Sequence, residues 1–195
     1  GIELERAVEM PDRLLRAPPV TFQASEIGEE AFGWNIPNEP LLASLQSRID
    51  ETKEIQQFAS AASTYEMSDG HISSALGGAS RLRAKLVIGA DGRGSKAREA
   101  AGIELRSWAY RQSAMVLAFS HSRSHSCIST EFHTETGPFT LVPLPGNRSS
   151  LVWVMNPASV REFEALSDAD LSLRIEQRMQ SMLGKVKVDP SRQFY

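Results

Sequence analysis

The sequence predicts a mixed α/β (α+β) fold in two parts, divided near residue 105. Two observations predict an open α/β portion over residues 1–105. An apolar run at 86–88 leads through a Gly-Ala-Asp-Gly turn into a short helix, and a capped amphipathic helix occupies residues 39–51. A third observation predicts an antiparallel sheet with helices over residues 106–195, because four β-rich runs follow one another with Gly- and Pro-containing connections between them.

Composition places the chain among ordinary globular proteins and excludes several function classes. Hydrophobic residues make up 41% of the 195 positions and charged residues 23%, which is enough for a sizeable core. No apolar run approaches the roughly 20 residues of a membrane span. A net charge of −3 without a dense basic block gives no indication of nucleic-acid binding. The one cysteine, Cys127, excludes an internal disulfide and is expected to be a small buried side chain.

The two ends of the chain predict that it is an internal piece of a longer protein. It begins at Gly1 on a charged segment without an initiator Met and without a signal-peptide pattern. It stops at Tyr195, shortly after the expected start of a strand.

The first part of the chain should contain an extended segment and then an amphipathic helix. Residues 12–25 are expected to be extended, since Val20–Ala24 alternates with period two. Asn38 is a good N-cap, and Pro40 falls in the first turn, where a missing N–H costs nothing. The helix over 39–51 then carries an apolar stripe that should be buried against a sheet. The stripe consists of Leu41, Leu42, Leu45 and Ile49.

The following residues predict a hairpin, a buried strand and a short helix. The Asp-Gly pair at 69–70 predicts a hairpin between residues 63–67 and 71–76, and Gly77-Gly78 marks a second turn. The run at 86–88 is continuously apolar, which is typical of a central parallel strand buried on both faces. A helix over 93–101 should end at Gly102.

The second part should begin with an antiparallel meander and continue with two helices and a strand. The expected strands are Ser113–His121, Ile128–Thr134, Phe139–Leu144 and Ser150–Met155. A helix over 158–166 follows, and Ser167 with Asp170 predicts the cap of the next one. That helix should end at Gly184, before a strand that starts near Val186. Its apolar stripe, expected in the core, is Leu171, Ile175, Met179 and Met182.

The run around Asp91 carries the clearest chemical signal in the chain. Asp91 follows an apolar strand, and Gly92 and Gly94 would let the backbone approach a ligand closely. A carboxylate cannot stabilise a phosphate directly, but it can accept a hydrogen bond from a ribose hydroxyl or hold a bridging water. Ser95 can join this network, and Arg98, one helical turn on, can supply a cation. An Asp-Gly pair alone would indicate only a turn, whereas the whole run predicts a nucleotide site.

A metal site is not expected, although several possible ligands lie close together in the sequence. His121, His125, His133, Cys127 and Glu131 are metal-ligating residue types. Their segment is predicted to be strand, turn and strand, which breaks the helical spacing that zinc sites use. Trp108, Trp153 and Phe139 are compatible with an aromatic pocket and equally with burial in a sheet.

The run from Leu86 to Gly92, with Ser95 and Arg98, resembles the Asp-Gly motif of group A flavoprotein aromatic hydroxylases. The remainder resembles one branch, the ubiquinone-biosynthesis hydroxylases of the 2-octaprenyl-6-methoxyphenol hydroxylase type. The matching blocks are Arg98–Ile103, Trp108-x-Tyr110-x-Gln112-x-Ala114, Ser129–Phe132, Thr136–Pro138, Leu141–Leu144 and Ser150–Trp153. The resemblance extends from about residue 20 to residue 190.

This resemblance implies a cofactor and site residues. Residues 1–105 would be a partial, Rossmann-like FAD-binding domain, and residues 106–195 a truncated substrate-binding domain. Asp91 and Gly92 would serve FAD and NAD(P)H, with Ser95 and Arg98 in support, and Asn38 would lie near the flavin. The family's Gly-x-Gly-x-x-Gly turn and its later Gly-Asp motif are missing from this sequence, so the FAD site is expected to be incomplete.

The implied activity is hydroxylation of a prenylated phenol ring in ubiquinone biosynthesis, with NAD(P)H and O₂ as co-substrates. The resemblance implies a cytoplasmic protein and leaves open a peripheral association with the inner membrane or with other enzymes. Two alternatives stay open: a non-catalytic fragment or scaffold that does not bind FAD by itself, and a related flavin-dependent reductase or dehydrogenase. No catalytic residue can be named from the sequence.

Overall fold

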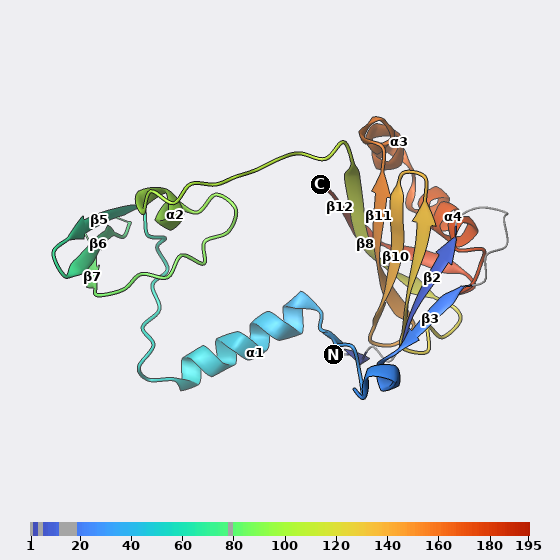
Figure 1. Cartoon of the computed structure of the whole chain (residues 1–195), viewed down its shortest axis with the longest axis horizontal. Helices are drawn as coiled ribbons and strands as arrows, with labels where there is room; N and C mark the ends of the chain where they lie inside the picture. The colour runs from blue at the N-terminus through green and yellow to red at the C-terminus, as the bar shows by residue number, and fades with distance from the viewer. Residues whose placement is uncertain (1, 4–5, 12–18, 78–79) are drawn as a thin grey trace. The chain divides into compact units, whose positions relative to one another are not determined.

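The computed structural model describes residues 2–3, 6–11, 19–77 and 80–195, and the chain divides into two compact units (Figure 1). The first unit contains Gly1–Gln46 and Tyr110–Tyr195, and the second contains Ser47–Ala109. The predicted division at residue 105 into cofactor and substrate domains concerns function and stays a prediction. No helix in the described ranges is long and apolar enough to cross a membrane.

A seven-stranded sheet dominates the first unit, with the order β12-β8-β11-β10-β9-β2-β3. The strands are β2 (Arg6–Pro11), β3 (Val20–Gln23), β8 (Ser113–His121), β9 (Ile128–Thr134), β10 (Gly137–Leu144), β11 (Arg148–Met155) and β12 (Val186–Phe194). All neighbours pair antiparallel except β2 and β9. The predicted antiparallel sheet is therefore confirmed, and β3 confirms residues 20–23 of the expected extended segment. Residues 24–25 are in a 3-10 helix instead, and residues 12–18 lie outside the described residues.

The predicted meander is wrong for the first of its four strands. β8 pairs with β11 rather than with β9, so only β9, β10 and β11 form a meander. Turn residues predict where a strand ends, but they do not determine which strand it pairs with.

One face of this sheet packs against helices and forms the core. A short 3-10 helix η2 (Pro157–Ser159) leads into α3 (Val160–Ala165) and α4 (Asp168–Arg178). The rings of Phe139 and Trp153 meet edge to face with centroids 4.9 Å apart, and Trp153 meets Phe163 of α3 in the same way at 4.9 Å. Phe139 and Trp153 are therefore core residues.

The helix α4 begins as predicted and ends earlier than predicted. The Ser167 hydroxyl accepts a hydrogen bond from the Asp170 backbone N–H at 3.1 Å, which confirms the cap. Leu171, Ile175 and Met179 are buried as expected. The helix stops at Arg178, however, because Gln180 and Ser181 adopt positive φ values of 52° and 54°, which a right-handed helix cannot contain.

Smaller elements complete the N-terminal region of the first unit. β1 (Ile2–Glu3) pairs with β4 (Trp34–Asn35), and a 3-10 helix η1 (Ala24–Ile27) follows β3. The Asn35 side-chain amide donates to the Pro143 carbonyl at 3.1 Å, which ties β4 to β10.

The helix α1 (Asn38–Glu51) confirms the predicted element but not its burial. It begins at Asn38, one residue earlier than expected, with the Leu41 N–H donating to the Pro37 carbonyl at 3.3 Å. None of its residues is buried. The expected burial of the stripe is therefore wrong, because an amphipathic pattern predicts which face is apolar and does not supply a surface to cover it.

The second unit contains a three-stranded antiparallel sheet and a short helix. The strands are β5 (Thr64–Ser68), β6 (His71–Ala75) and β7 (Arg81–Ala84), and the helix is α2 (Lys96–Ala100). The predicted Asp-Gly hairpin is confirmed, and Gly70 adopts a φ of 76°, which favours glycine. The second predicted turn falls partly on residues 78–79, outside the described part of the chain.

The predicted central strand at Leu86–Ile88 is wrong. These residues form no strand, and the side chains of Leu86 and Ile88 are 72% and 82% exposed. A parallel strand needs a neighbour to pair its backbone groups, and no described strand pairs with this segment.

We expect the Leu151→Ala substitution to destabilise the first unit by about 2–5 kcal/mol, because Leu151 is fully buried and its removal leaves a cavity. Denaturant unfolding followed by the fluorescence of the buried Trp153 measures this change. The matched control is Leu173→Ala on α4, where the side chain is 51% exposed and the change should stay within about 0.5 kcal/mol. Equal losses in the two variants would contradict the assignment of the core.

Candidate functional site

The turn after Leu86–Ile88 is organised around the carboxylate of Asp91. Its Oδ1 accepts a hydrogen bond from the Ser95 hydroxyl at 2.5 Å, and its Oδ2 accepts from the backbone N–H groups of Lys96 at 2.8 Å and Ala97 at 3.3 Å. Ser95 is the N-cap of α2 and accepts from the Arg98 N–H at 3.0 Å. The Asp91 carboxylate therefore helps to cap a helix, a role that the sequence analysis did not predict.

The boundaries of α2 follow from this cap. The helix starts at Lys96 rather than at residue 93, because Asp91 and Ser95 satisfy the free N–H groups of its first turn from outside. Gly102, with a φ of 65°, follows the last turn, and this confirms the predicted end.

The hydrogen bonds around Asp91 keep its side chain ionised. The Ser95 hydroxyl lowers the pKa of Asp91 below its ordinary value of 3.8, and the backbone N–H groups of Ala97 and Lys96 act in the same direction. Desolvation of the carboxylate, which is exposed, acts in the opposite direction but does not prevail. The carboxylate is therefore an anionic acceptor at neutral pH, and it has lone pairs beyond those that the cap uses.

The glycines of the turn leave its backbone open. Gly92 adopts a φ of 82°, and an added Cβ at Gly92 or Gly94 would have no atom within 4 Å. At Gly89 an added Cβ would lie 2.9 Å from the Cβ of Ala97, so that glycine lets the turn pack closely on α2. The stretch from Gly92 to Gly94 can thus be approached closely by a ligand.

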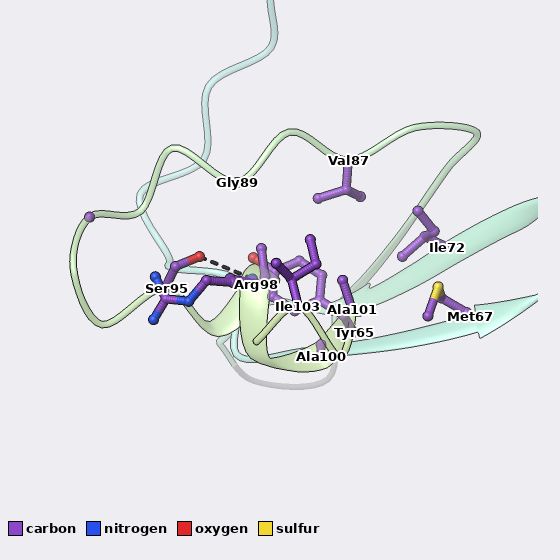
Figure 2. A pocket seen from close by; sticks show the side chains of 12 residues that line it. Tyr65, Met67, Ile72, Val87, Gly89, Ser95, Arg98, Ala100, Ala101 and Ile103 are labelled. Carbon is purple, nitrogen blue, oxygen red and sulfur yellow. Dashed lines mark hydrogen bonds between the residues drawn. The ribbon is translucent and has the colours of Figure 1, made fainter. Parts of the chain in front are cut away.

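Arg98 lies beside this turn, as Figure 2 shows. One terminal nitrogen of its guanidinium donates to the Arg93 carbonyl at 2.9 Å. This bond holds a cation close to the Asp-Gly turn, where the sequence analysis expected it. The structure thus brings Asp91, Gly92, Ser95 and Arg98 together.

Asn38 is the remaining site residue that the sequence analysis named. It is the first residue of α1 and belongs to the other compact unit. Its expected flavin contact stays a prediction.

A cavity of about 440 Å³ lies next to the Asp-Gly turn (Figure 2). One wall comes from the β5–β6 hairpin through Tyr65, Met67 and Ile72, and another from α2 and the residue Ile103 beyond it. The sequence analysis missed the hairpin wall. The sequence could have indicated this apolar face of the hairpin. Tyr65 and Met67 alternate with polar residues, and Met67 pairs with Ile72 across the hairpin.

The histidine group of the first unit is held by hydrogen bonds within the protein. His121 is buried, with Nδ1 2.7 Å from the Arg123 carbonyl and Nε2 3.0 Å from the Ser149 hydroxyl. His125 accepts from the Cys127 N–H at 3.1 Å, and its Nε2 donates to the Leu144 and Gly146 carbonyls, each at 3.0 Å. Within the described ranges no cluster of three or more His, Cys, Asp or Glu residues could hold a metal ion.

Cys127 and Trp108 are less buried than is usual for cysteine and tryptophan. Cys127 is only half-buried and adopts a φ of 55°, so it is not the fully buried side chain that was expected. It lies at a tight turn, where the backbone decides the position of the side chain. Trp108 is 70% exposed and belongs to the second unit, whereas Phe139 and Trp153 are core aromatics of the first.

Comparisons with known proteins identify the relatives of the chain. Residues 41–194 match a protein family described as an FAD binding domain. The ubiquinone hydroxylase UbiL of Rhodospirillum rubrum is 36% identical over 157 residues, which are 80% of this chain and 37% of that protein. The 3-demethoxyubiquinol 3-hydroxylase of Escherichia coli is 30% identical over 168 residues, which are 86% of this chain and 43% of that protein. The chain thus spans less than half the length of these two relatives.

Solved structures share the fold at low sequence identity. The p-nitrophenol 4-monooxygenase PnpA from Pseudomonas putida matches with a TM-score of 0.75 and 12% identity, covering 100% of this chain and 51% of PnpA. The R204Q variant of HpxO from Klebsiella pneumoniae, solved with FAD, matches with a TM-score of 0.73 and 15% identity, covering 100% of this chain and 52% of HpxO.

We expect the Ser95→Ala substitution to loosen the start of α2. It removes the N-cap acceptor and the hydroxyl donor to Asp91, a loss of about 1 kcal/mol. Amide hydrogen exchange at Arg98 should become about fivefold faster. Ser107→Ala, at an exposed position of the same unit, is the control and should leave this rate unchanged. Unchanged exchange in Ser95→Ala would show that the cap contributes nothing in solution.

We expect the first unit to lose stability in mild acid because of His121. Burial is the main cause that lowers the pKa of His121 below its ordinary value of 6.5. The unfolded chain therefore binds this proton more readily, so the contribution is complete above about pH 6.5 and is lost as the pH falls. The melting temperature should be lower at pH 5.5 than at pH 7.5, and His121→Gln should reduce the difference. His71→Asn, in the other unit, should retain it; an unchanged difference in His121→Gln would refute the assignment.

Proposed function

This chain belongs to the FAD binding domain family, and on that premise we propose that it forms part of a flavin-dependent monooxygenase that hydroxylates a prenylated phenol in ubiquinone biosynthesis. The names of the relatives support the substrate class, since UbiL is a ubiquinone hydroxylase and the Escherichia coli relative hydroxylates a demethoxyubiquinol. The single structural observation that carries the proposal is the open Asp-Gly turn, with an ionised carboxylate beside accessible glycine backbone.

The residues of this turn fit a contact with part of FAD. Asp91 is rigidly held by Ser95 and by α2, so its remaining lone pairs are directed before a ligand arrives. These lone pairs suit a ribose hydroxyl or a bridging water. Gly92 places no side chain between the ligand and the backbone, and Arg98 offers a cation for a phosphate.

FAD and the side chains of the turn would have different roles. When bound, FAD would supply the electron transfer from NAD(P)H and the activation of O₂, which protein side chains cannot supply. Asp91 and Gly92 would bind the cofactor, Ser95 would hold the Asp91 carboxylate, and Arg98 would balance negative charge. Asn38 is proposed as a second contact to the flavin. A prenylated phenol is the proposed small-molecule substrate.

A titration with FAD tests this proposal. We expect the chain to quench flavin fluorescence on binding, and Asp91→Asn to weaken binding by about tenfold, because a charge-assisted hydrogen bond becomes a neutral one. Asp69→Asn, in the hairpin turn of the same unit, is the matched control and should bind as the wild type does. Ser95→Ala separates the loss of the helix cap from the loss of the charge, since it retains the carboxylate.

Two outcomes would overturn the proposal in different ways. A chain that leaves flavin fluorescence unchanged would favour a scaffold that binds no FAD by itself. Flavin-dependent NAD(P)H oxidation without a hydroxylated phenol as product, measured on the longest protein that contains this chain, would favour a reductase or dehydrogenase.

A further inference from the structure

The sheet of the first unit has a second face, which the core does not use. Side chains alternate along each strand, so the neighbours of the buried core residues point to the opposite side. They are short and half-buried, and most of them are apolar; Ser150 of β11 stands in register between Val142 and Ala118 on this face. The apolar residues are Ala114, Val116 and Ala118 of β8, Val142 of β10, and Val152 and Val154 of β11.

A small polar group interrupts this surface at the β9–β10 pair. Glu131 lies directly opposite Thr140 across the two strands, and Thr140 Oγ1 donates to Glu131 Oε2 at 2.9 Å. The other carboxylate oxygen, Oε1, lies 3.6 Å from Nε2 of His133 on the same strand face. The Glu131 side chain is 36% exposed, so a ligand on this face can reach it.

The arrangement of Glu131 has the properties of a prepared acceptor. Thr140 fixes one oxygen of the carboxylate, and Nε2 of His133 lies within ion-pair distance of the other. On the side of β10, Val152 and Val116 pair in register with Thr140 and with each other, whereas on the other side β2 places Glu9 in register with Glu131. A flat apolar ring with one hydroxyl matches such a surface: the ring covers the valines and the hydroxyl meets the carboxylate.

We propose that Glu131, held by Thr140, accepts a hydrogen bond from the ring hydroxyl of the phenol substrate. This inference rests on the proposed function and adds the residue that orients the substrate. A phenol O–H that donates to a carboxylate forms a charge-assisted hydrogen bond and shifts electron density toward the ring. An electron-rich ring is the form of a phenol that an electrophilic oxygen attacks, so the same contact selects and activates the substrate. Thr140 acts through Glu131 and is a positioning residue.

A comparison of a phenol with its methyl ether tests this contact. The probes are 2-allylphenol and 2-allylanisole, which differ only in the hydroxyl proton and a methyl group. Backbone-amide chemical shifts of the whole chain give both dissociation constants and the place of binding. We expect the wild type to bind the phenol about fivefold more tightly than the ether, the difference that a charge-assisted hydrogen bond makes. The shifted amides should lie on β8, β9, β10 and β11, with that of Glu131 among them.

Two variants separate this contact from general effects on the fold. In Glu131→Gln, the ratio of the dissociation constants of the ether and the phenol should fall toward one, while the affinity for the ether stays the same. Thr140→Val keeps the shape of the side chain and should reduce the preference less. The matched control, Glu164→Gln on α3, changes an exposed carboxylate on the helix side and should retain the full preference.

Several results would overturn the inference. These are a wild type that binds neither probe, equal affinity for phenol and ether, an unchanged preference in Glu131→Gln, or shifts confined to the helix-covered side. The outcome is separate from that of the FAD titration. A chain that prefers the phenol but binds no flavin would reject the proposed function and keep this site, whereas flavin binding without a phenol preference would reject only the site.

Discussion

The alternation of side chains along the strands of the seven-stranded sheet is the constraint on which the first unit depends. Because successive residues point to opposite faces, Phe119, Leu141 and Leu151 can all be fully buried against α3 and α4, each contributing about 1.5–3 kcal/mol of hydrophobic stabilisation. The same period leaves the opposite face with short aliphatic side chains and the pair of Glu131 and Thr140. The side chains of this second face do not pack in the hydrophobic core, and the sheet holds them in place. The face is therefore a suitable surface for a ligand.

The Asp91 carboxylate shows how one residue can have a structural and a chemical role. Its bonds to Ser95 and to the first turn of α2 explain why an aspartate follows this apolar run, without any ligand. The same bonds keep it ionised and fixed in direction, which a cofactor contact also needs. The capping role and the proposed FAD contact are therefore compatible, because a carboxylate has more acceptor positions than the cap occupies.

Two apolar patterns in the sequence have no partner surface in the described structure. The Leu86–Ile88 run is exposed and unpaired, and the stripe of α1 is not buried. In both cases burial was predicted from the hydrophobicity of the segment alone. Burial and strand pairing are relations between two segments, so they cannot be deduced from one of them. The chain spans less than half the length of UbiL and of the Escherichia coli hydroxylase.

The sequence by itself determined the local features: the strands of the main sheet, the Asp-Gly hairpin, the Ser167 cap and the Asp-Gly motif that indicated the flavoprotein family. These depend on side-chain period, turn conformation and short hydrogen bonds, all of which act between residues close in the chain. Only the tertiary structure decided that β8 pairs with β11, that the hairpin walls a cavity beside Asp91, and that Glu131 meets Thr140 on the open face. Those contacts join segments separated along the chain, and the folded backbone, not the local pattern, selects which of them meet.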